Sequence, residues 1–280
     1  MPSKVLYPTN PPINIDLTIL GVHGVVHVAS NLSFSEDPNA VIPEVIAGID
    51  GILESATHEP MIKRFVFTSS STAATNPKPN TKFNIDANTW NNETVERAWA
   101  PPPYEKARRW DVYGASKTQA EQALWKFMDE KKPHFEANAV LPNANFGPIL
   151  SPQNQKDAST ANWVTTTYET GPGDLASIPP QYFVDVRDTC KLHIAALVDE
   201  DIKSERIFAF AETFTWNQLL GVLRKLRPQR KFAEDVPDNG RDLSVVVKQG
   251  RAVEILKKNF GQSSWTPLEE SVKANIAHLD

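Results

Sequence analysis

A tyrosine and a lysine four residues apart are the first residues here whose types and spacing suggest catalysis. Tyr113 and Lys117 lie in the segment YGASK, and residues at i and i+4 share one face of a helix. An ammonium beside a phenol favours the phenolate, which lowers the phenol pKa from about 10 toward neutral pH. Such a tyrosine can donate a proton to an oxygen or accept one. The alternative is an ordinary surface pair, because five tyrosines produce this spacing by chance about one time in three.

Three consecutive serines, Ser69 to Ser71, form the second candidate. They follow the apolar segment RFVFT at 64–68, and open α/β sheets bind ligands at the carboxyl ends of their strands. A hydroxyl there can donate a hydrogen bond to a substrate oxygen beside the tyrosine. A polar strand end that caps the next turn is an equally good interpretation. No Gly-x-Ser-x-Gly surrounds these serines, so they do not form a nucleophile elbow.

The histidines and the single cysteine do not predict a metal site. His23 and His27 lie in a segment that indicates a strand, which would not present them as a facing pair. His193 falls in a buried helix pattern and is interpreted as structural. Cys190 stands alone and no HExxH motif occurs, which excludes the common zinc patterns. We therefore expect no metal.

Five regular elements would position these side chains. Short apolar runs predict buried strands at 24–29, 64–68 and 135–141, and helical spacing predicts helices at 41–57 and 113–131. Strands that alternate with helices in this way predict an α/β fold, with a parallel sheet and helices on both faces. Further elements are predicted at 184–199, 215–226 and 266–279.

The composition excludes several classes of protein. The 280 residues, 40% of them hydrophobic, fit one large or two smaller globular domains. The net charge of −5 and the lack of a basic cluster argue against nucleic-acid binding. No apolar run reaches the roughly 18 residues of a membrane helix, and no signal-peptide core precedes residue 20. With one cysteine, the chain fits a reducing compartment, and we expect a cytoplasmic protein with no membrane partner.

Five stretches in order resemble the extended short-chain dehydrogenase/reductase family, within the NAD-dependent epimerase/dehydratase superfamily. The matching branch is that of aldehyde and ketone reductases related to dihydroflavonol and cinnamoyl-CoA reductases. The stretches are GVHGVVHVAS (21–30), RFVFTSSSTAA (64–74), YGASKTQAEQALWKF (113–127), LPNANFGP (141–148) and FVDVRDTCKLHIAAL (183–197). The tail SWTPLEESVKANI (264–276) resembles the family's last helix. The resemblance implies a Rossmann-like doubly wound parallel sheet with a smaller C-terminal substrate region.

The resemblance also implies a reaction. A nicotinamide cofactor, NADP or NAD, would pass hydride to a small aldehyde or ketone while Tyr113 protonates the carbonyl oxygen. Lys117 would lower the tyrosine pKa and bind the nicotinamide ribose. Ser70 matches the catalytic serine, and Ser71 is the less favoured substitute. The implied cofactor-binding residues are His27, Ala29, Ser30, Thr68, Ser69, Tyr113, Lys117, Pro142 and Asn143. The family signature at Asp185, Arg187 and Asp188 is interpreted as structural.

The beginning of the sequence departs from the family pattern. The family opens with a strand, a Gly-x-x-Gly-x-x-Gly turn that holds the pyrophosphate, and a helix, whereas only Gly21 and Gly24 precede Gly48 here. We therefore expect an N-terminally truncated sheet whose strand at 24–29 lies at the edge, and impaired cofactor binding. A wrong gene model, a truncated splice form and a diverged protein are the three explanations.

The predicted regions follow from the same match. They are an atypical Pro-rich segment at 1–20, a partial NAD(P)-binding Rossmann domain at 21–148 and 183–199, and a substrate-binding region at 149–182 and 200–280. Two other functions stay open. A nucleotide-sugar epimerase or dehydratase shares the fold, although the HVAS segment and the Trp-rich stretch at 85–110 argue against it. A catalytically inactive protein that acts by binding fits the missing glycine turn but not the retained Ser70, Tyr113 and Lys117. The oligomeric state stays open.

Overall fold

The computed structural model describes residues 19–155, 158–247 and 250–279. Two compact units divide the chain, and each is described by itself. Unit 1 comprises the described residues up to Asn76 together with Thr89–Leu141 and His193–Ile207. Unit 2 comprises Pro77–Asn88, Pro142–Leu192 and the described residues from Phe208 onward. The predicted Pro-rich segment lies outside the described residues except for its last two positions, and the predicted domain functions stay predictions.

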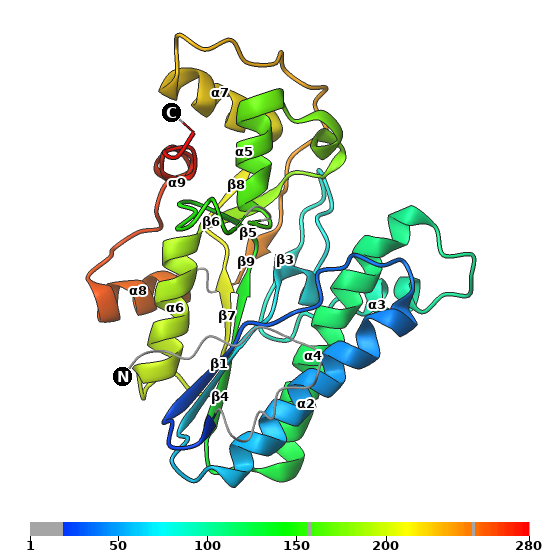
Figure 1. Ribbon diagram of the computed structural model, residues 1–280, viewed down its shortest axis with the longest axis vertical. Helices are drawn as coiled ribbons and strands as arrows, with labels where there is room; N and C mark the ends of the chain where they lie inside the picture. Colours follow the sequence, from blue (N-terminus) through cyan, green and yellow to red (C-terminus); the bar gives the residue numbers. More distant parts are fainter. Residues whose placement is uncertain (1–18, 156–157, 248–249, 280) are drawn as a thin grey trace. The chain divides into compact units, whose positions relative to one another are not determined.

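The sheet of unit 1 contains the three predicted strands and a fourth strand that was not predicted (Figure 1). Its strands are β1 (Gly24–His27), β2 (Arg64–Thr68), β4 (Glu136–Pro142) and β7 (Arg206–Ala209). They lie in the order β1-β2-β4-β7, and β1, β2 and β4 are parallel. β1 is the outer strand of this sheet among the residues that the structure describes. The prediction of an α/β fold with a parallel sheet is confirmed, and the first strand ends two residues earlier than expected.

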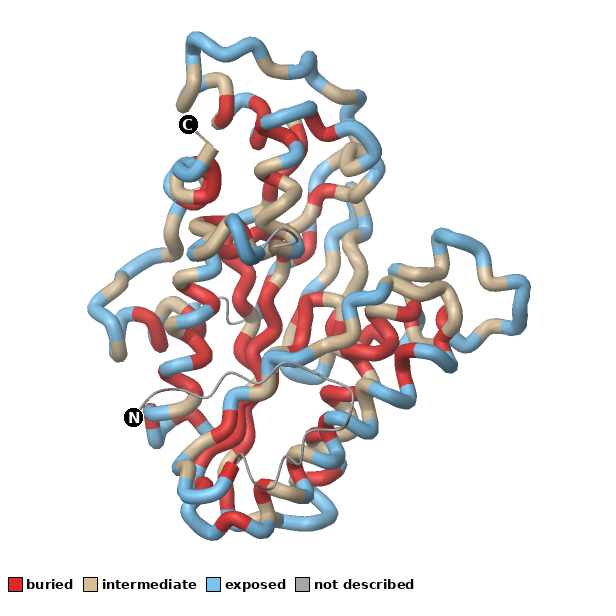
Figure 2. Tube along the Cα trace, in the orientation of Figure 1, coloured by how far each residue is buried: buried red, intermediate tan, exposed pale blue. Residues whose placement is uncertain are grey.

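Helices cover both faces of this sheet. On one face lie α2 (Ile42–His58) and α4 (Arg109–Lys131), and the last turns of α6 (Val186–Val198) lie on the other. The helix α2 buries Ile42, Ile49, Leu53 and Ala56, which recur at helical spacing. Figure 2 shows buried residues following the strands and the inward sides of these helices. The apolar pattern of the sequence therefore corresponds to the core of unit 1.

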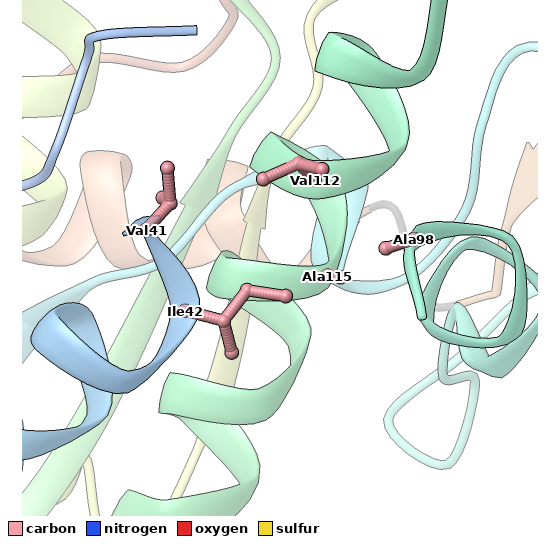
Figure 3. Packing of buried hydrophobic residues seen from close by; sticks show 5 residues of the cluster. All are labelled: Val41, Ile42, Ala98, Val112 and Ala115. Carbon is pink, nitrogen blue, oxygen red and sulfur yellow. The ribbon is translucent and has the colours of Figure 1, made fainter. Parts of the chain in front are cut away.

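The start of α4 is held by packing rather than by an N-cap. No side chain caps this helix, which begins four residues before the predicted position. A small apolar cluster joins it to α2 and α3 (Asn92–Ala98), and its buried members are Val41, Ile42, Ala98, Val112 and Ala115 (Figure 3). A Cβ at Gly114 would lie 3.0 Å from Thr94 Oγ1, so the glycine lets α3 approach α4 closely. These contacts position the first turns of α4.

Unit 2 is built from shorter elements. Its three-stranded sheet has the order β5 (Ala144–Phe146), β6 (Gln181–Asp185), β8 (Glu212–Phe214), and β3 (Asn84–Ile85) pairs with β9 (Val245–Val246). Its remaining helices are α5 (Ala161–Thr170), α7 (Trp216–Leu226), α8 (Gly250–Phe260) and α9 (Leu268–Asn275). A capping box between Thr215 and Gln218 starts α7. The helices predicted at 215–226 and 266–279 are present, whereas α5, α8, β5 and β8 were not predicted.

None of the described helices is long and apolar enough to cross a bilayer. Within the same residues, no group of three or more His, Cys, Asp or Glu side chains is placed to hold a metal ion.

Candidate active site

Tyr113 lies in the second turn of α4, partly buried beneath an aromatic residue. The Phe34 ring lies 5.3 Å from its ring, measured between centroids. Burial raises the pKa of the phenol above its usual value, and a hydrogen bond from Ser70 lowers it in opposition. The net shift of this pKa is therefore upward, because desolvation of the phenolate outweighs the Ser70 hydrogen bond. The expected effect of Lys117 on the phenol stays a prediction. A phenol that stays protonated at neutral pH is suited to donating its proton.

Ser70 is the serine that reaches the tyrosine. It follows the end of β2 and caps a short 3-10 helix, Ser71–Ala73. Its Oγ accepts hydrogen bonds from the Thr72 backbone N–H (3.2 Å) and the Thr72 hydroxyl (2.9 Å). With these two bonds accepted, the hydroxyl proton of Ser70 is free to point to Tyr113. The capping interpretation is confirmed for Ser70, which also contacts the tyrosine. Its hydrogen bond to a substrate oxygen stays a prediction.

Lys117 lies one helical turn beyond Tyr113 and is only 3% exposed. Its Nζ donates to the Thr68 carbonyl oxygen at 3.1 Å and lies 5.7 Å from the centre of the Phe67 ring. Burial lowers the pKa of the ammonium to about 8, and the negative charge of Glu121 raises it in opposition. The lysine therefore lies one turn from the tyrosine on α4, and its ammonium can lose a proton near neutral pH.

His27 is the last residue of β1 and lies beside Phe67 of the neighbouring strand β2. Its ring stacks on Phe67 with the centroids 5.8 Å apart. Burial lowers the pKa of His27 to about 4, and repulsion from the Lys117 ammonium adds to the shift. The imidazole is therefore neutral at physiological pH. A second histidine, His193, pairs with the Thr68 hydroxyl at 2.7 Å, which agrees with its interpretation as a structural residue.

The loop after β1 carries Ala29 and Ser30. Ala29 is exposed, whereas the Ser30 Oγ is buried and has no hydrogen-bond partner among the described residues. Buried hydroxyls in folded proteins are nearly always paired. Ser30 is thus the residue of this loop with an unused donor and acceptor.

Pro142 and Asn143 are the first residues of the second segment of unit 2, Pro142–Leu192. Pro142 is the last residue of β4. Asn143 donates its N–H to the Ala209 carbonyl oxygen (3.3 Å) and accepts from the Ala144 N–H through its Oδ1 (2.8 Å). The predicted cofactor contacts of these two residues stay predictions.

The Asp185 signature joins secondary-structure elements within unit 2. The carboxylate of Asp185 accepts from Arg187 Nε at 2.8 Å and from the Ser271 hydroxyl of α9 at 2.7 Å. Asp188 accepts from the Thr266 N–H at 2.8 Å. These contacts agree with the structural interpretation of the signature.

A buried carboxylate beside the site was missed by the sequence reasoning. Glu121 is completely buried and accepts a hydrogen bond from Ser69 Oγ at 2.6 Å. Its signal was present, because Glu121 continues the four-residue spacing of Tyr113 and Lys117 along one helix face. Its partner Arg206, at the start of β7, carries no comparable signal.

The sequence is similar to those of known reductases and NAD-binding proteins. A family model described as Male sterility protein, of an NAD-binding type, matches residues 14–135. Aldehyde reductase 2 of Sporidiobolus salmonicolor is 42% identical over 261 residues, which are 92% of this chain and 75% of that protein. The chain belongs to the extended short-chain dehydrogenase/reductase family. An NAD-dependent epimerase/dehydratase of Aspergillus terreus, terH, is 38% identical across 96% of the chain and 83% of its own length.

Two solved structures show the same fold. A reductase studied by structure-guided engineering to attenuate substrate inhibition is 26% identical, with a TM-score of 0.75 over 94% of this chain and 78% of the other. Gre2 of Candida albicans, solved with NADPH, has a TM-score of 0.79 at 23% identity, over 95% of this chain and 79% of the other. The Rossmann-like fold and the family resemblance are confirmed. The expected N-terminal truncation stays a prediction.

Proposed function

We propose that this short-chain reductase reduces the carbonyl group of a small aldehyde or ketone with a nicotinamide cofactor. One observation carries the proposal: Ser70 contacts Tyr113 at the end of β2, with the buried Lys117 one turn further along α4. This set holds a protonated phenol, a second hydroxyl donor and a cation together at the ligand-binding edge of a parallel sheet.

Each residue has a role that its contacts support. Tyr113 Oη transfers its proton to the carbonyl oxygen, and Ser70 Oγ hydrogen-bonds the same oxygen. Lys117 stabilises the phenolate that remains, and its own pKa near 8 allows it to return a proton at working pH. The cofactor, when bound, supplies the hydride.

The described residues fit one part of a dinucleotide and not another. The unpaired Ser30 hydroxyl and the Lys117 ammonium are donors of the kind that a nicotinamide ribose requires. Among the described residues the pyrophosphate has no comparable partner of the glycine-turn type, since the sequence contains no Gly-x-x-Gly-x-x-Gly motif. The first α-helix after β1, α2, begins without a side-chain cap or a preceding glycine turn. We therefore infer that this chain binds its cofactor weakly.

The cofactor inference is tested by calorimetry. Titration with NADPH and with NADH is expected to give dissociation constants in the millimolar range or no measurable heat. Micromolar binding of either nucleotide would contradict the inference and would show that other residues replace the glycine turn.

The reductase proposal is tested by replacing the tyrosine. The oxidation of NADPH or NADH, at several millimolar, is followed with a panel of aliphatic and aromatic aldehydes and ketones. Tyr113→Phe is expected to lower turnover by about 10²- to 10⁴-fold, because the proton donor is lost, with an unchanged melting temperature. Tyr104→Phe is the matched control, since Tyr104 stacks under Arg108 in the loop before α4, and it is expected to retain turnover.

Two outcomes would contradict the proposal. If Tyr113→Phe keeps most of its turnover, the tyrosine is not the proton donor. If the unmodified chain oxidises neither nucleotide with any member of the panel, the inactive binding protein becomes the better explanation.

A further inference from the structure

We propose that Glu121 is a positioning residue for the tyrosine–lysine pair, through a buried cluster that fixes the end of β2 and places a negative charge beside the lysine. The Glu121 cluster comprises Glu121, Ser69, Trp125 and Arg206. The proposal rests on the reductase function proposed above. It adds Glu121, which has no role in the proton and hydride transfer described there.

The carboxylate of Glu121 is fully hydrogen-bonded. Oε2 accepts from Ser69 Oγ (2.6 Å) and Arg206 Nη2 (3.3 Å), and Oε1 accepts from Arg206 Nε (2.7 Å) and Trp125 Nε1 (3.1 Å). Glu121 is 0% exposed, and its four donor atoms belong to three residues of unit 1. A buried charge is tolerated only when it is paired in this way.

Arg206 is itself held in place. Its Nη1 donates to the Thr89 carbonyl oxygen at 2.7 Å, and its guanidinium lies 3.8 Å from the centre of the Trp90 ring. Only 5% of the Arg206 side chain is exposed. The carboxylate of Glu121 therefore has one fixed orientation, which a surface ion pair would not provide.

Ser69 transmits that orientation to the active site. It lies between two residues whose atoms contact the catalytic side chains, since the Thr68 carbonyl accepts from Lys117 and the Ser70 hydroxyl contacts Tyr113. Ser69 also pairs its N–H with the Val140 carbonyl oxygen at 2.9 Å. A hydrogen bond of 2.6 Å from its side chain to a buried carboxylate limits how far this strand end can move.

The charge of Glu121 acts on Lys117 directly. The ammonium interacts with the charge of Glu121 on α4, with His27 on β1 and with the Thr68 carbonyl oxygen on β2. The hydroxyl of the same threonine pairs with His193 of α6. Glu121 is the only carboxylate among these groups, and its ion pair with Arg206 of β7 partly offsets its charge. Its attraction opposes the burial that drives Lys117 toward the neutral form.

Two substitutions separate the charge from the hydrogen bonds. Glu121→Gln keeps a side chain of the same shape, with an oxygen that can still accept from Ser69, but removes the charge. Glu121→Ala removes both. Ile49→Val is the matched control for a loss of stability alone, because Ile49 is a fully buried apolar residue of α2 and is not a member of the hydrogen-bonded Glu121 cluster.

The first measurement uses the protein without cofactor. The pKa of Lys117 is read from the Nζ resonance of ¹⁵N-lysine-labelled protein, which is assigned by its absence in Lys117→Arg. Glu121→Gln is expected to lower this pKa by about one unit, a tenfold change in the protonation constant. Ile49→Val is expected to lower the melting temperature and leave the Lys117 pKa unchanged. An unchanged pKa in a folded Glu121→Gln variant would overturn the proposal.

The second measurement follows turnover against pH. Glu121→Gln is expected to shift the limb of the kcat profile that reports Lys117 to lower pH by about one unit, with little change in the KM for the carbonyl substrate. Glu121→Ala is expected to lower kcat further, since the strand end is released as well. A uniform decrease in both variants, with no shift of the limb, would show that Glu121 is only structural.

Failure of the two proposals can be told apart. If the chain has no turnover, the resonance of Lys117 still decides the role of Glu121. If turnover is present and the Lys117 pKa does not move, the reductase function stands and the role of Glu121 does not.

Discussion

Two buried carboxylates in this protein have the same kinds of partner and different consequences. Glu121 in unit 1 and Asp185 in unit 2 are each completely buried, and each is bonded to one arginine and one serine hydroxyl. The serine bound by Glu121 is part of the strand end that carries the catalytic residues. The serine bound by Asp185, Ser271, lies in α9 and joins that helix to the end of β6.

The arginines differ in the same sense. Arg206 is 5% exposed and reaches Glu121 from the start of β7, 85 residues away in sequence. Arg187 is 41% exposed and lies two residues from Asp185. Residue types alone therefore do not reveal whether a buried carboxylate supports the active site or only joins secondary-structure elements. The location of the serine that donates to the carboxylate makes the difference.

The largest expected effect comes from removing the arginines. Arg206→Ala leaves Glu121 as an unpaired buried charge and is expected to lower the free energy of unfolding by about 3–5 kcal/mol. Arg187→Ala removes a half-exposed partner and is expected to cost about 1 kcal/mol or less. Urea unfolding of both variants measures the difference, and equal losses would remove the distinction between the two clusters.

His27 of unit 1 is expected to make the free energy of unfolding depend on pH. Its pKa is about 4 in the folded protein and 6.5 in a solvated histidine, so between these values the unfolded chain binds more protons. The stabilising effect of the neutral ring is complete above pH 6.5 and is lost as the pH falls through 4, by at most about 3 kcal/mol. Unfolding of the wild type and of His27→Phe is compared from pH 7 to 4. Parallel pH dependences would show that His27 does not titrate in this range.

The two serines give the smallest and sharpest comparison. Ser69→Ala and Ser271→Ala each remove one hydroxyl donor from a buried carboxylate, and each is expected to cost about 1.5–3 kcal/mol. Only Ser69→Ala is expected to reduce turnover as well, because Ser271 does not touch the residues that we place in the reaction. Reduced turnover in Ser271→Ala, with Ser69→Ala unaffected, would reverse the assignment of the two clusters.

Much of unit 1 could be predicted because its pattern is local and repeated. The segment RFVFT at 64–68 is apolar along its length and matches β2 at both ends. The helix α2 follows its spacing of apolar residues to within one residue at each end. In contrast, β5 and β8 have three residues each, too few for a periodicity to appear. Their pairing depends on partners distant in sequence.

By itself, the sequence determined the α/β architecture and the candidates Tyr113, Lys117 and Ser69 to Ser71, because apolar periodicity and motif spacing lie along the chain. The family resemblance then favoured Ser70 among the three serines. Only the tertiary structure decided which serine reaches the tyrosine and that burial raises the pKa of Tyr113. It alone also showed that Glu121 is bonded to Ser69 and Arg206. The physical reason is that hydrogen bonds and desolvation depend on which distant segments pack together. A linear pattern can indicate that a residue will be buried, but not which atoms will surround it.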